Sequence, residues 1–388
     1  MNINELIRKT EQIQPADRQA VFKAKERQDA LAKPPGSLGG LEEMSVRIAG
    51  MTGHVINRMG QGCVAVFCAD NGVTREGVAS APQSVTRAQT INFTRRLTGV
   101  GALAKSYDSE LLIVDMGVKD PIPAELYTAE PLKDTSKIVD RRIRETGETD
   151  NLAKGPAMTE SEALTAIETG MEMADAVYAE GFSMIGIGEM GIGNTTTSAA
   201  LISAMTGKSS EDTVGRGGGV NDEGFARKKE IVDRVSAEFR RSGGILKCPQ
   251  EERASLMVEA LAQMGGFDIC AMTGAYLGAA RCRMPVVIDG YISATAALAA
   301  SVIAPAAADY MIASHVSFEK GYMLAIESLG TKPFLSLDMR LGEGSGCPIA
   351  FSIIRGACDV MANMGTFDEA EINDDYLEEI RREEKYQR

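Results

Sequence analysis

The chain has 388 residues, of which 44% are hydrophobic, and it carries a formal net charge of -13 at neutral pH. This composition can fill a sizeable core, and the length predicts two or three domains, or one large α/β domain with an accessory part. The acidic balance argues against nucleic acid or an anionic membrane as the main partner, but a small anionic substrate needs only a local basic pocket.

Cysteine usage and hydropathy predict a cytoplasmic protein. The seven cysteines form no CxxC pair and the chain has only two histidines, which favours reduced thiols and argues against a zinc site. No apolar signal segment follows Met1, and the small apolar stretch 294–308 is interrupted by Pro305. That stretch is too short and too weakly apolar to cross a bilayer, so no membrane partner is expected.

Apolar runs of strand length alternate with helix-like segments along the chain. Strands are predicted at 62–69, 111–116, 182–187, 285–288 and 333–337, and helices at 41–59, 84–99, 159–181, 251–265, 268–281, 294–300 and 348–363. This order predicts an α/β protein with a parallel sheet and a site outside the carboxyl ends of its strands. Acidic residues follow five of the strand ends and predict a shared cleft: Asp70, Asp115, Glu189, Asp289 and Glu343.

Residues 182–201 form the stretch around which the chain is organised. An apolar strand leads into a glycine-rich turn, and a segment rich in Thr, Ser and Ala then begins a helix. The first N–H groups of a helix have no intrahelical partner, and the helix dipole adds positive potential there. Glycines let the backbone approach an anion, and the hydroxyls of Thr195, Thr196 and Thr197 add donors. The pattern predicts a phosphate-binding turn.

Two stricter nucleotide motifs can be tested on this stretch. Residues 186–191 (GIGEMG) match the dinucleotide fingerprint GxGxxG, but Glu211, about twenty residues further on, lies in a polar segment instead of at a strand end. The P-loop motif fails, because Ile202 stands where a glycine is required five residues before Gly207. A nicotinamide dinucleotide site and a tight turn without a ligand remain open as alternatives.

Strings distributed over nearly the whole chain carry a family resemblance. They are KPPGSLGGLE (33–42), ADNGVTREGV (69–78), GPAMT (155–159), GEMGIGNTTTSAAL (188–201), GRGGGVND (215–222), GGFDICAMTGAYLGAA (265–280), PVVIDGYIS (285–293), SHVSFEKG (314–321) and MRLGEGSG (339–346). In content and order they resemble the nicotinate-nucleotide–dimethylbenzimidazole phosphoribosyltransferases of cobalamin lower-ligand assembly. The strings GEMGIGNTT and MRLGEG are unusual, which makes the resemblance specific.

The resemblance implies a fold and an assembly. The fold is α/β, with a Rossmann-like parallel sheet flanked by helices and a smaller helical domain formed from both termini. The large catalytic domain is expected at 40–345, and the small domain with its acidic tail at 1–39 and 346–388. Because family members form dimers with the active site near the interface, a homodimer is expected, with a heterodimer with a related subunit as the alternative. No cofactor and no metal are implied.

The resemblance also implies a reaction and its residues. Nicotinate mononucleotide and an aromatic base (dimethylbenzimidazole, or a related benzimidazole, purine or phenol) would give an α-ribosyl base phosphate and nicotinate. By motif position, Glu343 is the catalytic base. The implied contacts to the nucleotide are Glu189, Gly191, Gly193, Asn194, Thr195, Thr196, Lys228, Ser317 and Asp289, and those to the aromatic base are Ser80, Gln89, Arg340 and Leu341.

These residue types suit the implied chemistry. The pyridinium of the nucleotide is already a cationic leaving group, so its departure needs no strong acid. Nearby carboxylates stabilise the positive charge that develops at the anomeric carbon. An azole loses its N–H proton as it attacks, and Glu343 can accept that proton. His315 is interpreted as a structural hydrogen-bonding group.

The chain departs from the family pattern around the aromatic base. Family members usually carry ADHG where this chain has Asn71, and they often have a serine and an aromatic residue where it has Ala79 and Ala81. Cys347-Pro348 replaces small residues after the catalytic loop. We interpret these differences as an altered choice of base, with a phenol or another small base as the candidate. An NAD-dependent oxidoreductase, a subunit of a hetero-oligomeric transferase and a catalytically idle nucleotide-binding partner remain alternatives.

Overall fold

The structure is a computed structural model that describes residues 1–377, so the end of the predicted acidic tail (378–388) lies outside the described residues. The chain divides into two compact units. The larger unit contains residues 1–14 and 61–349, and of the described residues the smaller one contains 15–60 and 350–377. In the part of the chain described, no helix combines the length and apolar character needed to cross a membrane.

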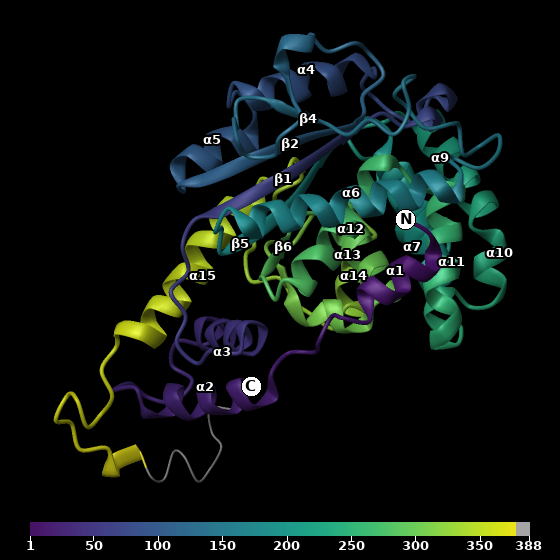
Figure 1. Ribbon diagram of the computed structural model, residues 1–388. Coiled ribbons are helices and arrows are strands. Elements are labelled where there is room, and N and C mark those ends of the chain that lie inside the picture. Colours follow the sequence, from purple (N-terminus) through teal and green to yellow (C-terminus); the bar gives the residue numbers. More distant parts are fainter. Residues whose placement is uncertain (378–388) are drawn as a thin grey trace. The chain divides into compact units, whose positions relative to one another are not determined.

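The larger unit is built on a parallel sheet of seven strands (Figure 1). The strands are β1 (Gly62–Ala69), β2 (Ser109–Gly117), β3 (Tyr127–Thr128), β4 (Ile138–Asp140), β5 (Met184–Met190), β6 (Val286–Ile288) and β7 (Met311–Ala313). Their spatial order is β3-β4-β2-β1-β5-β6-β7, and every pairing is parallel. The order reverses between β1 and β5, which is where open parallel sheets place their ligand sites. The predicted α/β class with a parallel sheet is confirmed.

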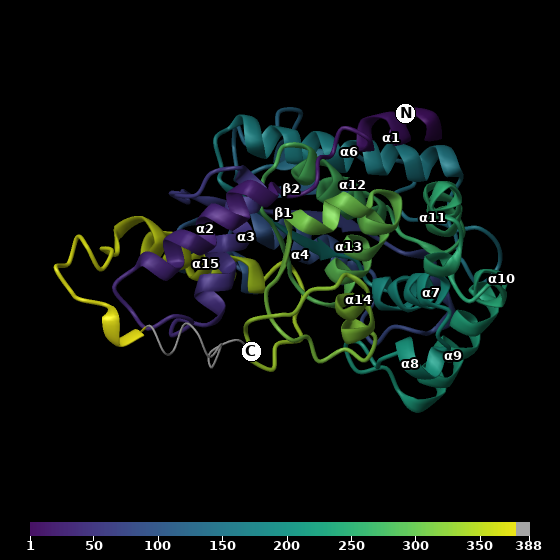
Figure 2. The ribbon, with the colours of Figure 1, turned by 90° about the horizontal axis from the view of Figure 1, so that it is seen from below.

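The helices of the chain are α1 (Ile3–Thr10), α2 (Arg18–Ala30), α3 (Gly40–Thr52), α4 (Ser84–Thr94), α5 (Gly99–Ser106), α6 (Glu160–Ala179), α7 (Asn194–Thr206), α8 (Ser210–Thr213), α9 (Asp222–Val235), α10 (Ala237–Arg241), α11 (Gln250–Met264), α12 (Phe267–Arg281), α13 (Tyr291–Ile303), α14 (Tyr322–Ser328) and α15 (Gly346–Asn363). Helix α12 packs against β1, β2 and β5, and α6 covers α12 in turn. Helix α4 contacts β1, β2 and β5, and α5 contacts β2, on the side of the strands away from α6 and α12 in Figure 1. Helices α7, α8, α9 and α10 form one group (Figure 2).

Local sequence explains the central elements. All eight residues of β1 are buried, as expected for a continuous apolar strand covered on both faces. Helix α6 begins as predicted at Thr159, whose side chain accepts from the N–H of Glu162 while the Glu162 carboxylate accepts from the N–H of Thr159. This capping box satisfies two N–H groups that would otherwise lack partners at the helix start.

Helices α6 and α12 approach each other closely because glycines face the contact. A Cβ atom on Gly170 would lie 1.8 Å from the backbone oxygen of Ala271, and one on Gly274 would lie 1.8 Å from that of Ile167. Only hydrogen fits at either position. The glycines of the predicted helix at 268–281 thus serve backbone-to-backbone packing.

The smaller unit joins two distant parts of the sequence. Helices α2 and α3 pack on each other, and a small apolar core is formed by Ala24, Val46, Ala49 and Met361. The side chain of Arg27 donates to the backbone oxygen of Met361 at 2.9 Å, which ties α2 to the C-terminal part of α15.

The division into units differs from the predicted boundaries at 39/40 and 345/346. Residues 1–14 belong to the larger unit, where the amino group of Met1 and the side chain of Lys9 both form ion pairs with Glu168 of α6 at 2.7 Å. Residues 40–60 belong to the smaller unit because α3 packs on α2. Short-range sequence signals reveal neither set of long-range contacts.

The prediction of a strand at 333–337 is wrong. This segment is extended, but among the described residues it forms only an isolated parallel bridge between His315 and Leu335. The seventh strand is β7, three buried residues that were not predicted because they follow directly on an alanine-rich segment. The short strands β3 and β4 were likewise missed within the polar stretch that precedes α6.

The packing of α6 on α12 yields a first prediction. Replacing Gly274 by Ala forces a methyl group against the backbone of α6, and overpacking of this kind costs about 1–3 kcal/mol. We expect Gly274→Ala to lower the free energy of unfolding by at least this amount in urea titrations. Gly356→Ala on α15, where an added methyl group meets nothing within 4 Å, is the control and should be neutral or stabilising. Equal stability of the two variants would contradict the packing argument.

Candidate active site

A cavity of about 310 Å³ lies at the carboxyl ends of β5 and β6, with further walls from the segments that follow β1 and β7. This is the edge of the sheet predicted to carry the site. Twelve of the fourteen predicted site residues line it: Ser80, Gln89, Glu189, Gly191, Gly193, Asn194, Thr195, Asp289, Ser317, Arg340, Leu341 and Glu343. Thr196 and Lys228 do not.

One end of the cavity is the turn between β5 and α7. Gly193 caps α7 with φ +99°, a conformation that favours glycine, and Gly191 fits so tightly that a Cβ would lie 2.4 Å from the backbone oxygen of Ala69. The N–H of Ile192 donates to the Thr86 hydroxyl at 3.2 Å, which ties the turn to α4. The N-terminus of a thirteen-residue helix therefore faces the cavity and favours an anion there.

Lys228 supports this end from behind. Its side chain is 1% exposed, and its ammonium donates to the Thr195 hydroxyl at 2.8 Å and to the backbone oxygen of Gly215 at 3.2 Å. The ammonium thus reaches the cavity through Thr195. Thr196 is fully buried, and its hydroxyl has no hydrogen-bond partner among the described residues.

Glu343 lies at the other end of the cavity and is 4% exposed. Its Oε1 accepts from the Gln89 amide at 3.1 Å, and its Oε2 accepts from the N–H of Val100 in the first turn of α5 at 3.2 Å. Burial raises the pKa of Glu343 above its ordinary value, although these donors favour the charged form. A carboxylate with a raised pKa is a better proton acceptor.

Glu189 connects the two ends. Its carboxylate accepts from the Asn194 amide at the start of α7 and lies 3.4 Å from the backbone nitrogen of Glu343. Burial, together with the nearby charge of Asp268, raises the pKa of Glu189 to about 8. Asp268 accepts from the same Asn194 amide at 3.2 Å, so one side-chain amide serves two buried carboxyl groups.

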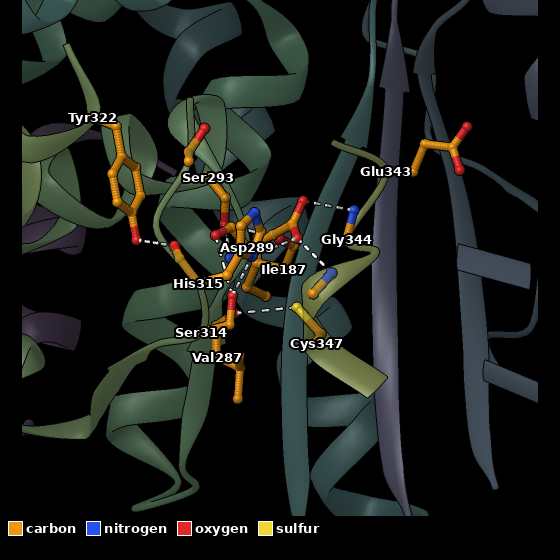
Figure 3. A network of polar contacts seen from close by, with 12 residues as sticks. Ile187, Val287, Asp289, Ser293, Ser314, His315, Tyr322, Glu343, Gly344 and Cys347 are labelled. Atoms are coloured by element: carbon orange, nitrogen blue, oxygen red, sulfur yellow. Dashed lines mark hydrogen bonds and ion pairs between the residues drawn. The ribbon is translucent and has the colours of Figure 1, made fainter. Parts of the chain in front are cut away.

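Asp289 follows β6 and is 2% exposed. Its carboxylate accepts from the backbone N–H groups of Gly344 and Gly346, next to Glu343 (Figure 3). The Glu343 side chain extends to the opposite side of this loop, away from Asp289 (Figure 3). Burial raises the pKa of Asp289 to about 7, and the two N–H groups act against that rise.

Comparison with known proteins finds relatives over nearly the whole chain. A family model described as phosphoribosyltransferase (DBI_PRT) matches residues 13–372. A protein from Clostridium perfringens (strain ATCC 13124) is 44% identical over 374 residues, 96% of this chain and 97% of its own, and is named nicotinate-nucleotide–dimethylbenzimidazole phosphoribosyltransferase. A Clostridium tetani protein of the same name is 42% identical over 370 residues, 95% of this chain and 96% of its own. The crystal structure of CobT from Thermus thermophilus superimposes with a TM-score of 0.82 at 37% identity, over 92% of this chain and 99% of that one.

This chain belongs to the nicotinate-nucleotide–dimethylbenzimidazole phosphoribosyltransferase family. It is a pentosyltransferase of that type, as the sequence strings predicted. The family model covers most of both units, since it extends from residue 13 to residue 372.

The dinucleotide alternative is not supported. Gly186 and Gly188 lie inside β5 instead of in the turn, so they cannot wrap a pyrophosphate as the fingerprint requires. Glu211 lies in the short helix α8 and not at the end of a second strand. The residues match the spacing of GxGxxG but lack the structural context that a dinucleotide site requires.

Four further residues with charged or titratable side chains line the cavity of this transferase, and the sequence did not assign them to the site: Arg216, Tyr291, His315 and Glu319. His315 had been interpreted as a structural group, and all four lie in strings that carried the family resemblance. The glycines around Arg216 indicate only a flexible loop when the sequence is read alone. In the structure its guanidinium pairs with Asp222 at 2.6 Å and stacks over the ring of Phe225 at 4.7 Å, both of which tie the loop to α9.

The buried ammonium yields a prediction about stability. Burial lowers the pKa of Lys228 to about 8, against roughly 10.4 in an unfolded chain. Because the folded pKa is lowered, charged Lys228 opposes folding below pH 8, and this cost disappears as the pH rises towards 10.4. The wild type should therefore gain stability between pH 7 and pH 10, whereas Lys228→Met lacks this ammonium and should not show that gain. We expect the difference in unfolding free energy, variant minus wild type, to decrease by up to about 3 kcal/mol over this range.

Urea titrations at both pH values measure this difference. Lys229→Met is the matched control, because Lys229 adjoins Lys228 on α9 but is 24% exposed and pairs with Glu211 near the surface. If this difference in unfolding free energy did not change with pH for Lys228→Met, or changed equally for Lys229→Met, the lowered pKa of Lys228 would be contradicted.

Proposed function

We propose that this chain transfers the ribose phosphate of nicotinate mononucleotide to an aromatic base, releasing nicotinate, as a step of cobamide synthesis. The observation that carries the proposal is a single cavity lined both by the start of α7 and by Glu343. The names of the relatives support the same substrates. No cofactor is needed for this reaction.

The start of α7 suits the phosphate. The helix dipole, the Thr195 hydroxyl and the charge of Lys228 behind Thr195 all favour an anion at this place. Ser317 and Arg216 line the same cavity and add a hydroxyl and a positive charge. Fixing the phosphate away from the reacting carbon holds the ribose in position for attack and removes most of the entropic cost of the encounter.

The carboxylate end suits the incoming base. In the proposed step the C1′–N bond to nicotinate breaks and a C1′–N bond to the azole forms, while the azole N–H proton passes to Glu343. The pyridinium leaves as a neutral ring because it takes the bond electrons with it. Attack from the face opposite nicotinate converts the β configuration to α. Asp289 and Glu343 line the same cavity, and in their charged forms they would add negative potential to a positively charged ribose, whereas Glu189, with a pKa of about 8, is mostly protonated near neutral pH.

The wall that would meet the aromatic base is small and apolar. Val78, Ala79, Ala81, Val85 and Leu341 line the cavity beside Ser80 and Gln89. Short side chains at 79 and 81 leave room that an aromatic residue before Pro82 would fill. This supports the proposal that base choice differs from that of ordinary members, with phenols as an alternative class of substrate.

The cellular setting and the assembly are part of the proposal. All seven cysteines are free thiols in the structure, which supports a reducing compartment such as the cytoplasm. A homodimer follows from the family resemblance, and a heterodimer with a related subunit is the alternative. The mass of the purified chain in solution, with and without such a subunit, distinguishes them.

The role of Glu343 can be tested by removing its basicity. We expect Glu343→Gln to lower kcat roughly 10²–10⁴-fold, the usual contribution of a general base, with binding of nicotinate mononucleotide unchanged. Nicotinate release by the purified chain, with dimethylbenzimidazole as acceptor, measures turnover, and calorimetry measures binding. In the wild type the rate should fall as the pH drops through the raised pKa of Glu343, because only the carboxylate accepts a proton.

Unchanged turnover of Glu343→Gln would remove this residue from the mechanism. Absence of nicotinate release from the wild type, with any aromatic acceptor, would favour the idle-partner reading instead.

The choice of base can be tested by competition between acceptors. We expect phenol or a small benzimidazole to compete more strongly in the wild type than in Ala81→Phe, because the added ring occupies the space beside Pro82. The ratio of the two ribosylated products, separated by chromatography, measures the preference. If the wild type prefers dimethylbenzimidazole as strongly as the variant does, the altered pocket is refuted.

A further inference from the structure

The loop that carries Glu343 has an unusual backbone. Gly342, Glu343 and Gly344 follow one another with φ values of +84°, +63° and +86°. Glycine adopts such values freely, but a glutamate at +63° is strained and persists only where its surroundings hold it. Something must therefore hold this loop.

Asp289 is the group that holds it. One carboxylate oxygen accepts from the N–H of Gly346 at 2.7 Å, and the other accepts from the N–H of Gly344 at 3.1 Å. Gly344 directly follows Glu343, and Gly346 is the first residue of α15. The carboxylate of a strand end thus caps a helix that lies far away in sequence, and the helix dipole strengthens the contact.

The residues packed around Gly346, which we call its seat, leave little room for movement. A Cβ on Gly346 would lie 2.4 Å from His315 Nδ1, 2.8 Å from Ser314 Oγ and 2.9 Å from the Asp289 carboxylate. The Ser314 hydroxyl and His315 Nδ1 are 3.0 Å apart, and the Tyr322 hydroxyl donates to the backbone oxygen of His315 at 2.6 Å (Figure 3). The Ser314 hydroxyl also donates to the backbone oxygen of Asp289 at 3.2 Å, so the residues packed against Gly346 are tied to Asp289 as well.

The other side of Glu343 is held separately. Its carboxylate contacts Gln89 of α4 and the N–H of Val100 in α5, neither of which touches Asp289. The position of the Glu343 side chain consequently depends on contacts to its carboxylate and on contacts to the backbone around it. The backbone contacts are those of Asp289 with Gly344 and Gly346 and a longer one, at 3.4 Å, between Glu189 and the N–H of Glu343. Losing the contacts from Asp289 lets the strained loop relax to negative φ and moves the proton acceptor.

We propose that Asp289 acts as a positioning residue for Glu343, through the N–H groups of Gly344 and Gly346, and not as a ligand of the ribose. The inference rests on the proposed function of the site, since it assigns Glu343 the role of base. It changes the reading of Asp289 from the sequence, because both of its oxygens are already engaged by the loop.

Asp289→Asn tests the proposal. The amide keeps the shape of the side chain but turns one acceptor into a donor that faces a backbone N–H. We expect kcat to fall about 10–10²-fold, the range expected for a displaced catalytic group, while the dissociation constant of nicotinate mononucleotide changes less than about twofold. Gly346→Ala, which presses a methyl group into the same seat without changing charge, should reproduce the loss of kcat.

A double-variant cycle separates positioning from an independent role. If Asp289 acts only through Glu343, Asp289→Asn should cause no further fall in kcat in the Glu343→Gln background. Asp17→Asn is the matched control, because Asp17 also accepts from two N–H groups at a helix start, at 2.9 and 3.0 Å, but does not line the cavity. Its kcat should equal that of the wild type.

Three outcomes would overturn the proposal. Weaker nucleotide binding by Asp289→Asn with kcat preserved would make Asp289 a ribose ligand, and an additive loss in the double variant would give it a role of its own. Full turnover by both Asp289→Asn and Gly346→Ala would refute the positioning role of Asp289 and leave the proposed function standing. If the wild type released no nicotinate, the proposed function itself would fail and this inference with it.

Discussion

The parallel pairing of β1 with both β2 and β5 is the constraint on which the site depends. Because the strand order reverses between β1 and β5, the segments that leave these strands diverge and leave a space at the edge of the sheet. The turn after β5 and the loop after β1 reach this space from adjacent strands, and Asp289 reaches it from β6. Antiparallel pairing would have sent these segments to opposite edges.

The cavity is lined both by a helix N-terminus and by three buried carboxyl groups. The start of α7 supplies the positive potential of a helix N-terminus, whereas Glu189, Asp289 and Glu343 supply buried carboxyl groups. Burial is costly for each of them, and raised pKa values at all three acids report that cost. A nucleotide with an anionic phosphate and a cationic ring matches this separation of charge better than a substrate of one sign.

Strain and support occur together at the catalytic loop. The positive φ of Glu343 would be unfavourable in isolation. The flanking glycines adopt positive φ values without strain, but they do not reduce the strain at Glu343. The compensating interactions come from residues remote in sequence: Asp289, Gln89 and the first turn of α5. Such compensation explains why a carboxylate in a glycine-rich string is held in a defined place instead of lying free on a surface turn.

The sequence by itself determined the α/β class, the glycine-rich turn between a strand and a helix, the helix that follows Thr159 and the family, because these depend on local patterns or on strings read in order. Twelve of the fourteen residues that it assigned to the site also line the cavity. Only the tertiary structure decided that Lys228 contacts the cavity-lining Thr195 without lining the cavity itself, that β7 and not 333–337 completes the sheet, and that residues 40–60 belong with the smaller unit. It alone revealed that Asp289 holds the loop of Glu343. Each of these outcomes depends on hydrogen bonds or packing between segments far apart in the chain, and such pairings leave no periodicity in a single sequence.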